Sequence, residues 1–142
     1  MAWLRLVYYQ IIYWLVGTTP EEHHSSMAYA WYEVNSHRNC IHHCQSFLKY
    51  KEADQVKAMM ASSYGAAGDW ENAALAYRSI TQLWSEPSFA LGLAEAELRR
   101  GNSQEARKIV ATVEVSHPSP SYGLAQSLGQ LNQELGNPAR PD

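Results

Sequence analysis

The chain has 142 residues, of which 46% are hydrophobic and 18% are charged, and its formal net charge at pH 7 is −3. A chain of this length can bury a sizeable core, and this composition excludes an intrinsically disordered protein. The slight acidic balance offers no basic excess to a run of phosphates, so it argues against a nucleic-acid-binding protein. The two cysteines are four residues apart and cannot staple a secreted mini-domain, which favours a reducing compartment.

No motif of a familiar enzyme class is present in the sequence. The chain has no Walker-type phosphate loop, no glycine-rich dinucleotide fingerprint, no GxSxG and no HExxH. Nine Tyr and five Trp stand against two Phe, and rings with a polar edge suit half-buried surfaces, including interfaces. The sequence therefore predicts a binding scaffold and not an enzyme, with no catalytic residue and no cofactor.

Residues 3–16 form an almost entirely apolar run, interrupted by Arg5 and Gln10. The run is shorter than the roughly 20 residues of a membrane-spanning helix. It also lacks the basic start and the small-residue cleavage site of a secretory signal. A helix that is buried or covered by a partner is the preferred interpretation, while a membrane anchor and a signal remain alternatives. Translation starting at Met27 is also compatible with the sequence.

The segment after this run carries the signals of a helix start. Thr19 can act as an N-cap, Pro20 suits a first turn, and the two glutamates that follow favour the positive end of the helix dipole. We expect this helix to cover 20–34 and to end at Asn35, and a third helix to cover 37–50.

Three potential metal ligands share one face of that third helix: His37, Cys40 and Cys44. With one ligand from a neighbouring helix they could bind zinc. Zinc sites usually use turns and paired CxxC knuckles, which are missing here, and cysteine is among the most buried residue types. We therefore expect core packing with surface histidines, and no metal site.

From residue 53 onward the chain repeats itself at an offset of 33 residues, and Leu93–Asn102 resembles Leu128–Asn137 more weakly at an offset of 35. A period near 34 with a glycine turn between two helices predicts a helical-hairpin solenoid. The alternative is a non-repetitive helical bundle. The matched pairs are Gly68 with Gly101, Ala73 with Ala106, Tyr77 with Val110, and Ile80 with Val113.

These positions fit the tetratricopeptide (TPR) pattern. Ala61 and Ala94 are the small residues that let two helices cross closely, and Tyr64 is the aromatic residue that follows, which Glu97 replaces in the second copy. The predicted fold is all-α: a TPR-like helical-hairpin solenoid of about three repeats with a C-terminal capping helix, forming a single domain over 1–142. Its parts are N-terminal helices over 1–50, two TPR repeats over 53–118, a capping helix over 119–136 and a frayed tail over 137–142. The later helices are expected at 53–66, 70–83, 87–100, 103–114 and 121–135.

A TPR array presents the first helix of each repeat on a concave face, and here that face is small and apolar. Such a groove suits an amphipathic helix better than an extended acidic tail. The alternative is that the small residues only let neighbouring repeats pack closely and that the tail helix only caps the solenoid. The predicted groove residues are Ala58, Ser62, Gly65, Ala66, Leu91, Glu95, Leu98 and Arg99, joined by Leu124, Leu128 and Leu131 of the tail helix.

Two stretches carry a family resemblance. The first runs from Leu15 to Trp31, and the second runs from Phe47 to Pro87 and includes Ser62-Ser63 and Gly68-Asp69-Trp70. In both, the sequence resembles the TPR-type needle chaperones of bacterial type III secretion systems, the YscG/PscG type. Between Trp31 and Gly68 the chain is longer than that family by about one helix, which holds His37 to Cys44.

The resemblance implies a chaperone in the bacterial cytoplasm that holds a needle or filament subunit soluble by gripping its amphipathic helix. It implies a heterotrimer with a small helical co-chaperone, and no nucleic acid or membrane partner. A generic TPR adaptor, attached to a membrane through residues 3–16, is the alternative. The residues expected to bind the co-chaperone are Trp3, Leu6, Val7, Ile11, Trp14 and Leu15.

Overall fold

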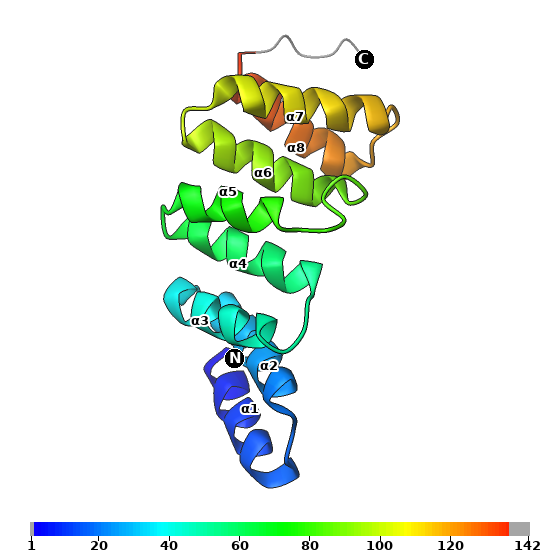
Figure 1. Cartoon of the computed structure of the whole chain (residues 1–142). Helices are drawn as coiled ribbons and strands as arrows, with labels where there is room; N and C mark the ends of the chain where they lie inside the picture. Colours follow the sequence, from blue (N-terminus) through cyan, green and yellow to red (C-terminus); the bar gives the residue numbers. More distant parts are fainter. Residues whose placement is uncertain (1, 137–142) are drawn as a thin grey trace. The chain divides into compact units, whose positions relative to one another are not determined.

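The computed structural model describes residues 2–136, and every regular element in that range is an α-helix (Figure 1). The prediction of an all-α chain is therefore confirmed for these residues, and the β-like piece around Thr112 lies inside a helix. The tail expected over 137–142 lies outside the described residues. The helices are α1 (Ala2–Val16), α2 (Pro20–Glu33), α3 (His37–Leu48), α4 (Asp54–Ala66), α5 (Trp70–Arg78), α6 (Pro87–Arg99), α7 (Ser103–Ser116) and α8 (Tyr122–Glu134).

The helix bounds agree closely with the predicted ranges except at the end of α5. This helix stops at Arg78, where the sequence predicted an end at residue 83. The Ser79 hydroxyl donates to the Ala76 carbonyl at 2.7 Å, a local bond that competes with continued helix. Ile80 and Leu83, which suggested the longer helix, are buried in the turns that follow. Apolar residues therefore continue past the helix because the loop itself is packed.

The described helices form two compact units that meet in the sequence between Asp69 and Trp70. Unit 1 contains α1 to α4, and unit 2 contains α5 to α8.

In unit 1, α2 packs against α1, α3 and α4, and α3 packs against α4. The predicted start of α2 is confirmed by a capping box, in which the Thr19 side chain accepts from the Glu22 amide and the Glu22 carboxylate accepts from the Thr19 amide. A small cluster joins α1 to α2 through Leu6, Met27 and Ala30. The main core of the unit consists of Ala28, Cys40, Cys44, Phe47 and Val56.

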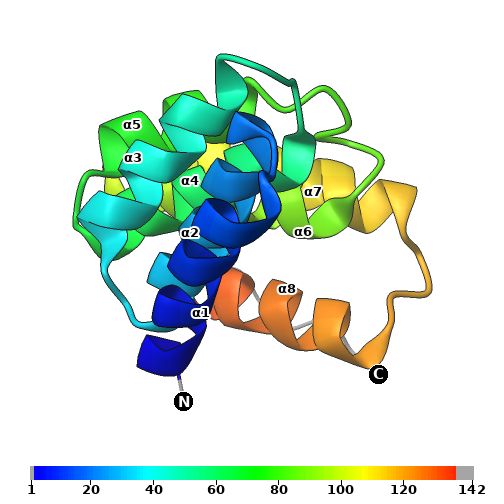
Figure 2. The ribbon, with the colours of Figure 1, turned by 90° about the horizontal axis from the view of Figure 1, so that it is seen from below.

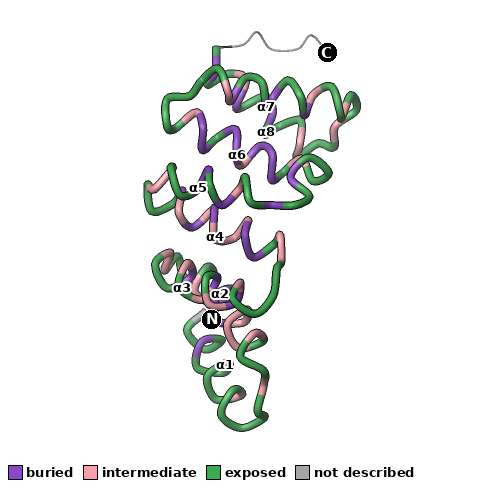
Figure 3. The backbone as a smooth tube through the Cα atoms, in the orientation of Figure 1, coloured by how far each residue is buried: buried purple, intermediate pink, exposed green. Residues whose placement is uncertain are grey.

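In unit 2, α6 is the central helix and contacts α5, α7 and α8. Figure 3 shows it as the helix of this unit with the most buried residues. The α5–α6 contact is close at Gly92, where an added Cβ would lie 2.4 Å from the Tyr77 ring. Helix α8 runs alongside α6 and α7 (Figure 2) and buries Leu128 and Leu131.

The predicted 33-residue repeat is present in the local backbone geometry. Gly68 and Gly101 both have the left-handed backbone of a helix C-terminus, with φ of 82° and 85°. After each glycine the next amide bonds to a carbonyl five residues earlier: Asp69 to Tyr64 at 2.9 Å and Asn102 to Glu97 at 2.8 Å. Two helices 33 residues apart therefore end in the same way.

A third copy of this geometry precedes these two, and the sequence analysis missed it. Asn35 lies 33 residues before Gly68, has φ of 56°, and is followed by a Ser36 amide that bonds to Trp31 at 3.0 Å. The helix counted as additional to the family pattern is thus the second helix of an earlier repeat, α2–α3. Burial repeats with the same period: Ala28, Ala61 and Ala94 are buried, as are Cys40, Ala73 and Ala106.

Candidate functional site

Unit 2 contains an open groove of about 430 Å³ between α6 and α8, called the α6–α8 groove below. Leu91 of α6 and Leu124 and Leu131 of α8 supply its large apolar side chains. Leu91 and Leu131 are buried and Leu124 is half-buried, so the leucines form a floor that is open at Leu124. The remaining lining residues are Glu86, Pro87, Ser88, Gly92, Glu95, Ser121, Gly123, Ser127, Gln130 and Glu134.

Helical spacing on both helices builds the walls of this groove. Ser88 and Glu95 are seven residues apart on α6, so they lie on one face two turns apart. On α8, Gly123, Ser127 and Glu134 share a face in the same way. Small residues at these positions keep the groove open, because Gly123 has nothing within 4 Å of the place where a Cβ would stand.

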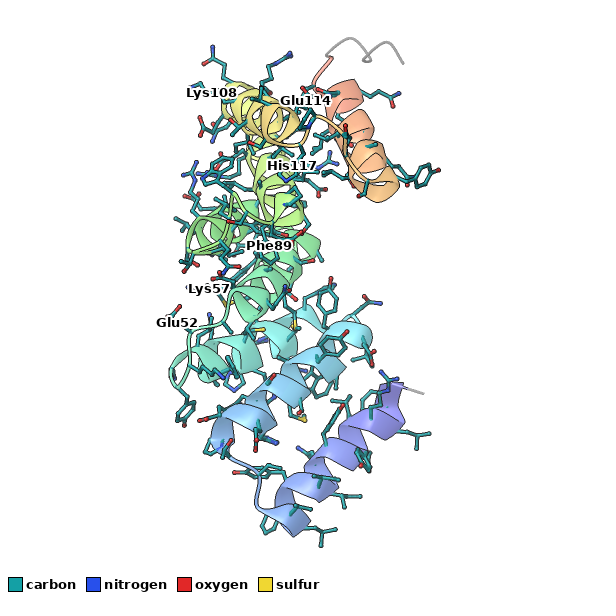
Figure 4. The ribbon with its side chains drawn as sticks, turned by 90° about the vertical axis from the view of Figure 1, so that its right-hand side faces the viewer. Glu52, Lys57, Phe89, Lys108, Glu114 and His117 are labelled. Atoms are coloured by element: carbon teal, nitrogen blue, oxygen red, sulfur yellow. The ribbon has the colours of Figure 1, made fainter. Side chains whose placement is uncertain are left out.

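One arginine crosses from α6 to α8 beside the groove. Arg99 lies 3.1 Å from the Glu134 carboxylate and 3.9 Å from that of Glu95. All three side chains are partly exposed, so these pairs position the helix ends more than they stabilise the fold. On the other edge of α8, Asn132 donates to Glu114 at 2.9 Å, and Figure 4 shows Glu114 on the side of α7 that faces α8.

Four of the predicted groove residues in unit 2 line this groove: Leu91, Glu95, Leu124 and Leu131. The other three are placed differently. Leu128 is buried in the unit, Leu98 is half-buried outside the lining, and Arg99 acts through its ion pairs. The sequence pattern missed the polar wall of α8, since it singled out only the leucine stripe.

The predicted groove residues of α4 belong to unit 1 and are not part of the α6–α8 groove. Ala58 and Ser62 are half-buried, Gly65 is buried and Ala66 is exposed. The Ser62 hydroxyl lies 3.1 Å from the hydroxyl of Tyr32 in α2, so this residue joins two helices of its own unit. A concave face that continues through α4 stays a prediction.

Unit 1 exposes a large apolar surface on α1. Trp3, Val7, Ile11, Trp14 and Leu15 are each at least half exposed, and Trp14 and Leu15 reach 87% and 78%. Together with Leu4 and Tyr8, which the sequence analysis did not single out, they form the α1 surface. Across the described residues, no helix has both the length and the apolar character needed to cross a membrane.

Leu6 is the exception among the residues predicted to bind a co-chaperone. It is 4% exposed and packs against Met27 and Ala30 of α2. Its place in the core corrects the prediction, because a buried side chain cannot be presented to a partner. The apolar run could not reveal this, since it is apolar on every face.

The cysteines and histidines of α2 and α3 separate into two groups. Cys40 and Cys44 are buried free thiols with sulfurs 3.9 Å apart, and the hydrogen bond to Cys40 together with burial raises the pKa of Cys44. His37 takes no part in this pair. Within residues 2–136, no three His, Cys, Asp or Glu side chains are arranged to hold a metal ion.

The other group is a histidine cluster that joins α2 and α3. The Nδ1 atoms of His24 and His43 are 3.0 Å apart, and the His23 ring lies 4.0 Å from the ring of Tyr13 in α1. Burial, followed by the charges of neighbouring histidines, lowers the pKa of His43 to about 4. The cluster is therefore held in its neutral form near pH 7 and contributes packing and hydrogen bonding.

No protein-family model matches the chain, and a search of curated proteins finds no match either. The function is therefore inferred from the residues of the chain itself.

Proposed function

We propose that the chain is a TPR-type chaperone that holds a needle or filament subunit of a type III secretion system by gripping its amphipathic helix. The observation that carries this proposal is the α6–α8 groove, whose leucine floor is open to solvent at Leu124. An amphipathic helix laid in a groove is a recurrent way of binding a peptide, with its apolar face in contact with the floor.

The local repeats support the TPR interpretation. Small residues are buried at one position in the first helix of each 33-residue copy, Ala28, Ala61 and Ala94, as close helix crossing in a TPR array requires. Helix α8 then occupies the place of a capping helix, and its outer face supplies one wall of the groove. Capping and binding are compatible roles for one helix.

Covering the helix of a filament subunit serves a clear physical purpose. A subunit that polymerises carries self-complementary apolar surfaces, which assemble whenever the free concentration is high enough. A chaperone that binds the monomer lowers the free concentration by mass action and holds the subunit soluble. This role needs binding alone, without a catalytic residue, cofactor or metal.

The α1 surface is the proposed site of the small helical co-chaperone, which would complete a heterotrimer in the bacterial cytoplasm. Its exposed tryptophans, Trp3 and Trp14, are residues that interfaces favour, and an apolar patch of this kind marks an interaction site. The same exposure favours the second candidate, a generic TPR adaptor attached to a membrane through residues 3–16. Co-sedimentation with lipid vesicles separates the two, since only the adaptor binds vesicles in the absence of other proteins.

The test begins with the protein isolated from its own cell and mass spectrometry of the chain that co-purifies. That chain should be a short helical filament subunit. Leu124→Glu should release it, because the charge would face an apolar helix and lose its hydration. Ala125→Glu is the matched control, since Ala125 is an exposed neighbour on the same helix that does not line the groove. Retention of the subunit by Leu124→Glu, with helicity unchanged, would contradict the proposed groove.

A further inference from the structure

We infer that the α6–α8 groove selects partner helices whose apolar stripe is flanked by Lys or Arg. This inference rests on the proposed function, in that it presumes that the groove holds a helix, and it adds the charge character of that helix. The groove is lined by three carboxylates, Glu86, Glu95 and Glu134.

The carboxylates lie at both ends of the groove. Glu86 is the N-cap residue of α6 and Glu134 is the last residue of α8. The pair between Arg99 and Glu134 at 3.1 Å ties the C-terminal end of α6 to that of α8, so the two helices run in the same direction. A helix lying along the groove would thus meet negative charge at each end of its apolar stripe.

Little positive charge offsets these carboxylates. Arg99 pairs with Glu134 and, at 3.9 Å, with Glu95. Glu86 accepts a hydrogen bond from the Ser88 hydroxyl at 3.1 Å, and a hydroxyl does not neutralise it. With Arg99 counted, the groove retains an excess of two negative charges.

The other basic side chains of unit 2 are engaged elsewhere. Arg78 and Arg100 both pair with the buried Glu97, at 2.9 and 3.0 Å. Lys108 lies 3.7 Å from Glu105 on α7, and Arg107 donates to the Leu135 carbonyl. None of these four residues lines the groove. Charge in this unit is therefore sorted, with carboxylates on the binding face.

Sorted charge acts on partner choice more than on total affinity. Each exposed pair changes the affinity modestly, and two or three together give about a tenfold preference for a basic over a neutral partner. The Debye length falls from about 10 Å at 0.1 M salt to about 3 Å at 1 M, so the preference should shrink as salt is added. An apolar contribution from the leucine floor would not shrink in this way.

Three synthetic helical peptides test the inference on the full-length protein. They share one leucine stripe and carry Lys, Gln or Glu at the flanking positions, and their affinities are measured by fluorescence anisotropy at low and high salt. We expect the Lys peptide to bind about tenfold more tightly than the Gln peptide, the Glu peptide to bind most weakly, and high salt to bring the three together.

Two variants locate the effect in the groove. Glu86→Gln combined with Glu95→Gln should bring the Lys peptide close to the Gln peptide in affinity. Glu105→Gln on α7 is the control for a lost exposed charge outside the groove and should leave the preference intact. Glu134 stays unchanged in both, because it holds Arg99.

The outcomes separate the two proposals. If the Gln peptide binds and loses affinity in Leu124→Glu, but all three peptides bind equally, charge selection is overturned while the groove stands. A lysine preference that survives the double Glu86→Gln, Glu95→Gln change also overturns the inference, since the attraction would come from another surface. If none of the peptides binds, the groove itself is wrong and both proposals fall.

Discussion

Glu97 offers the sharpest test of how unit 2 is held together. Its side chain is completely buried, and its carboxylate accepts from Arg100 at 3.0 and 3.1 Å and from Asn102 at 2.7 Å. The Arg78 guanidinium lies 2.9 Å away. One carboxylate thereby connects α5, α6 and the turn that follows α6. We predict that Glu97→Ala destabilises the protein by about 3 kcal/mol.

The magnitude follows from what each partner loses. Removing one member of a buried, hydrogen-bonded ion pair costs roughly 3–5 kcal/mol, mostly because the remaining charge is left without a partner. Here the arginine side chains are 47% and 26% exposed, for Arg78 and Arg100, so water replaces part of what they lose. This places the cost at the lower end of that range. Glu97→Gln keeps the shape and one acceptor oxygen, and should cost about half as much.

Urea unfolding followed by far-ultraviolet circular dichroism measures both changes. Glu95→Ala is the matched control on the same helix, because Glu95 is half exposed and its nearest cation is 3.9 Å away. That variant should change the free energy of unfolding by less than about 0.5 kcal/mol. If Glu97→Ala and Glu95→Ala have equal stabilities, the buried carboxylate contributes nothing and our account of unit 2 is refuted.

Three further predictions concern packing, pH and exposure. Gly92→Ala should destabilise the protein by about 1–3 kcal/mol, since its Cβ would overlap the Tyr77 ring, whereas Gly123→Ala, with open space around it, should stabilise by up to about 1 kcal/mol in the same urea titration. The pKa of His43 is about 4 in the folded state and 6.5 in a free side chain, so the unfolded state binds more protons between these values. Stability should therefore fall as the pH drops from about 6.5 to 4, and His43→Gln should flatten that dependence in urea titrations across this range. The full-length chain should self-associate through the α1 surface in sedimentation, and Trp14→Ser should reduce this; a monomeric full-length chain at high concentration would contradict it.

Helix positions could be read from the sequence because their signals are local. Thr19, Pro20 and Glu22 form the start of α2 whatever the helix later packs against, since the capping box satisfies the first amides from within four residues. Gly68 and Gly101 end helices because a left-handed backbone costs glycine little. Leu91, Glu95, Leu124 and Leu131 were likewise predicted from helical spacing and do line one groove.

The first repeat escaped the sequence analysis because its defining residues changed type while keeping their geometry. Asn35 takes the left-handed position that glycine occupies in the other two copies, which asparagine tolerates better than most residues. Cys40 replaces the alanine at the helix crossing and is equally buried. A search for Gly and Ala at a fixed period passes over both, although the backbone treats the three copies alike.

Packing between helices decided what no local signal could. Leu6 is buried and Trp14 exposed although both lie in one apolar run, because only the face toward α2 finds a partner within the unit. Glu97 reads as a departure from an aromatic position, yet three donors brought to it by α5, α6 and the following turn make a buried carboxylate favourable there. Sequence spacing determined which residues share a helix face. Which face meets a neighbour, and which side chains meet across it, depends on contacts between helices far apart in the chain, and those exist only in the folded structure.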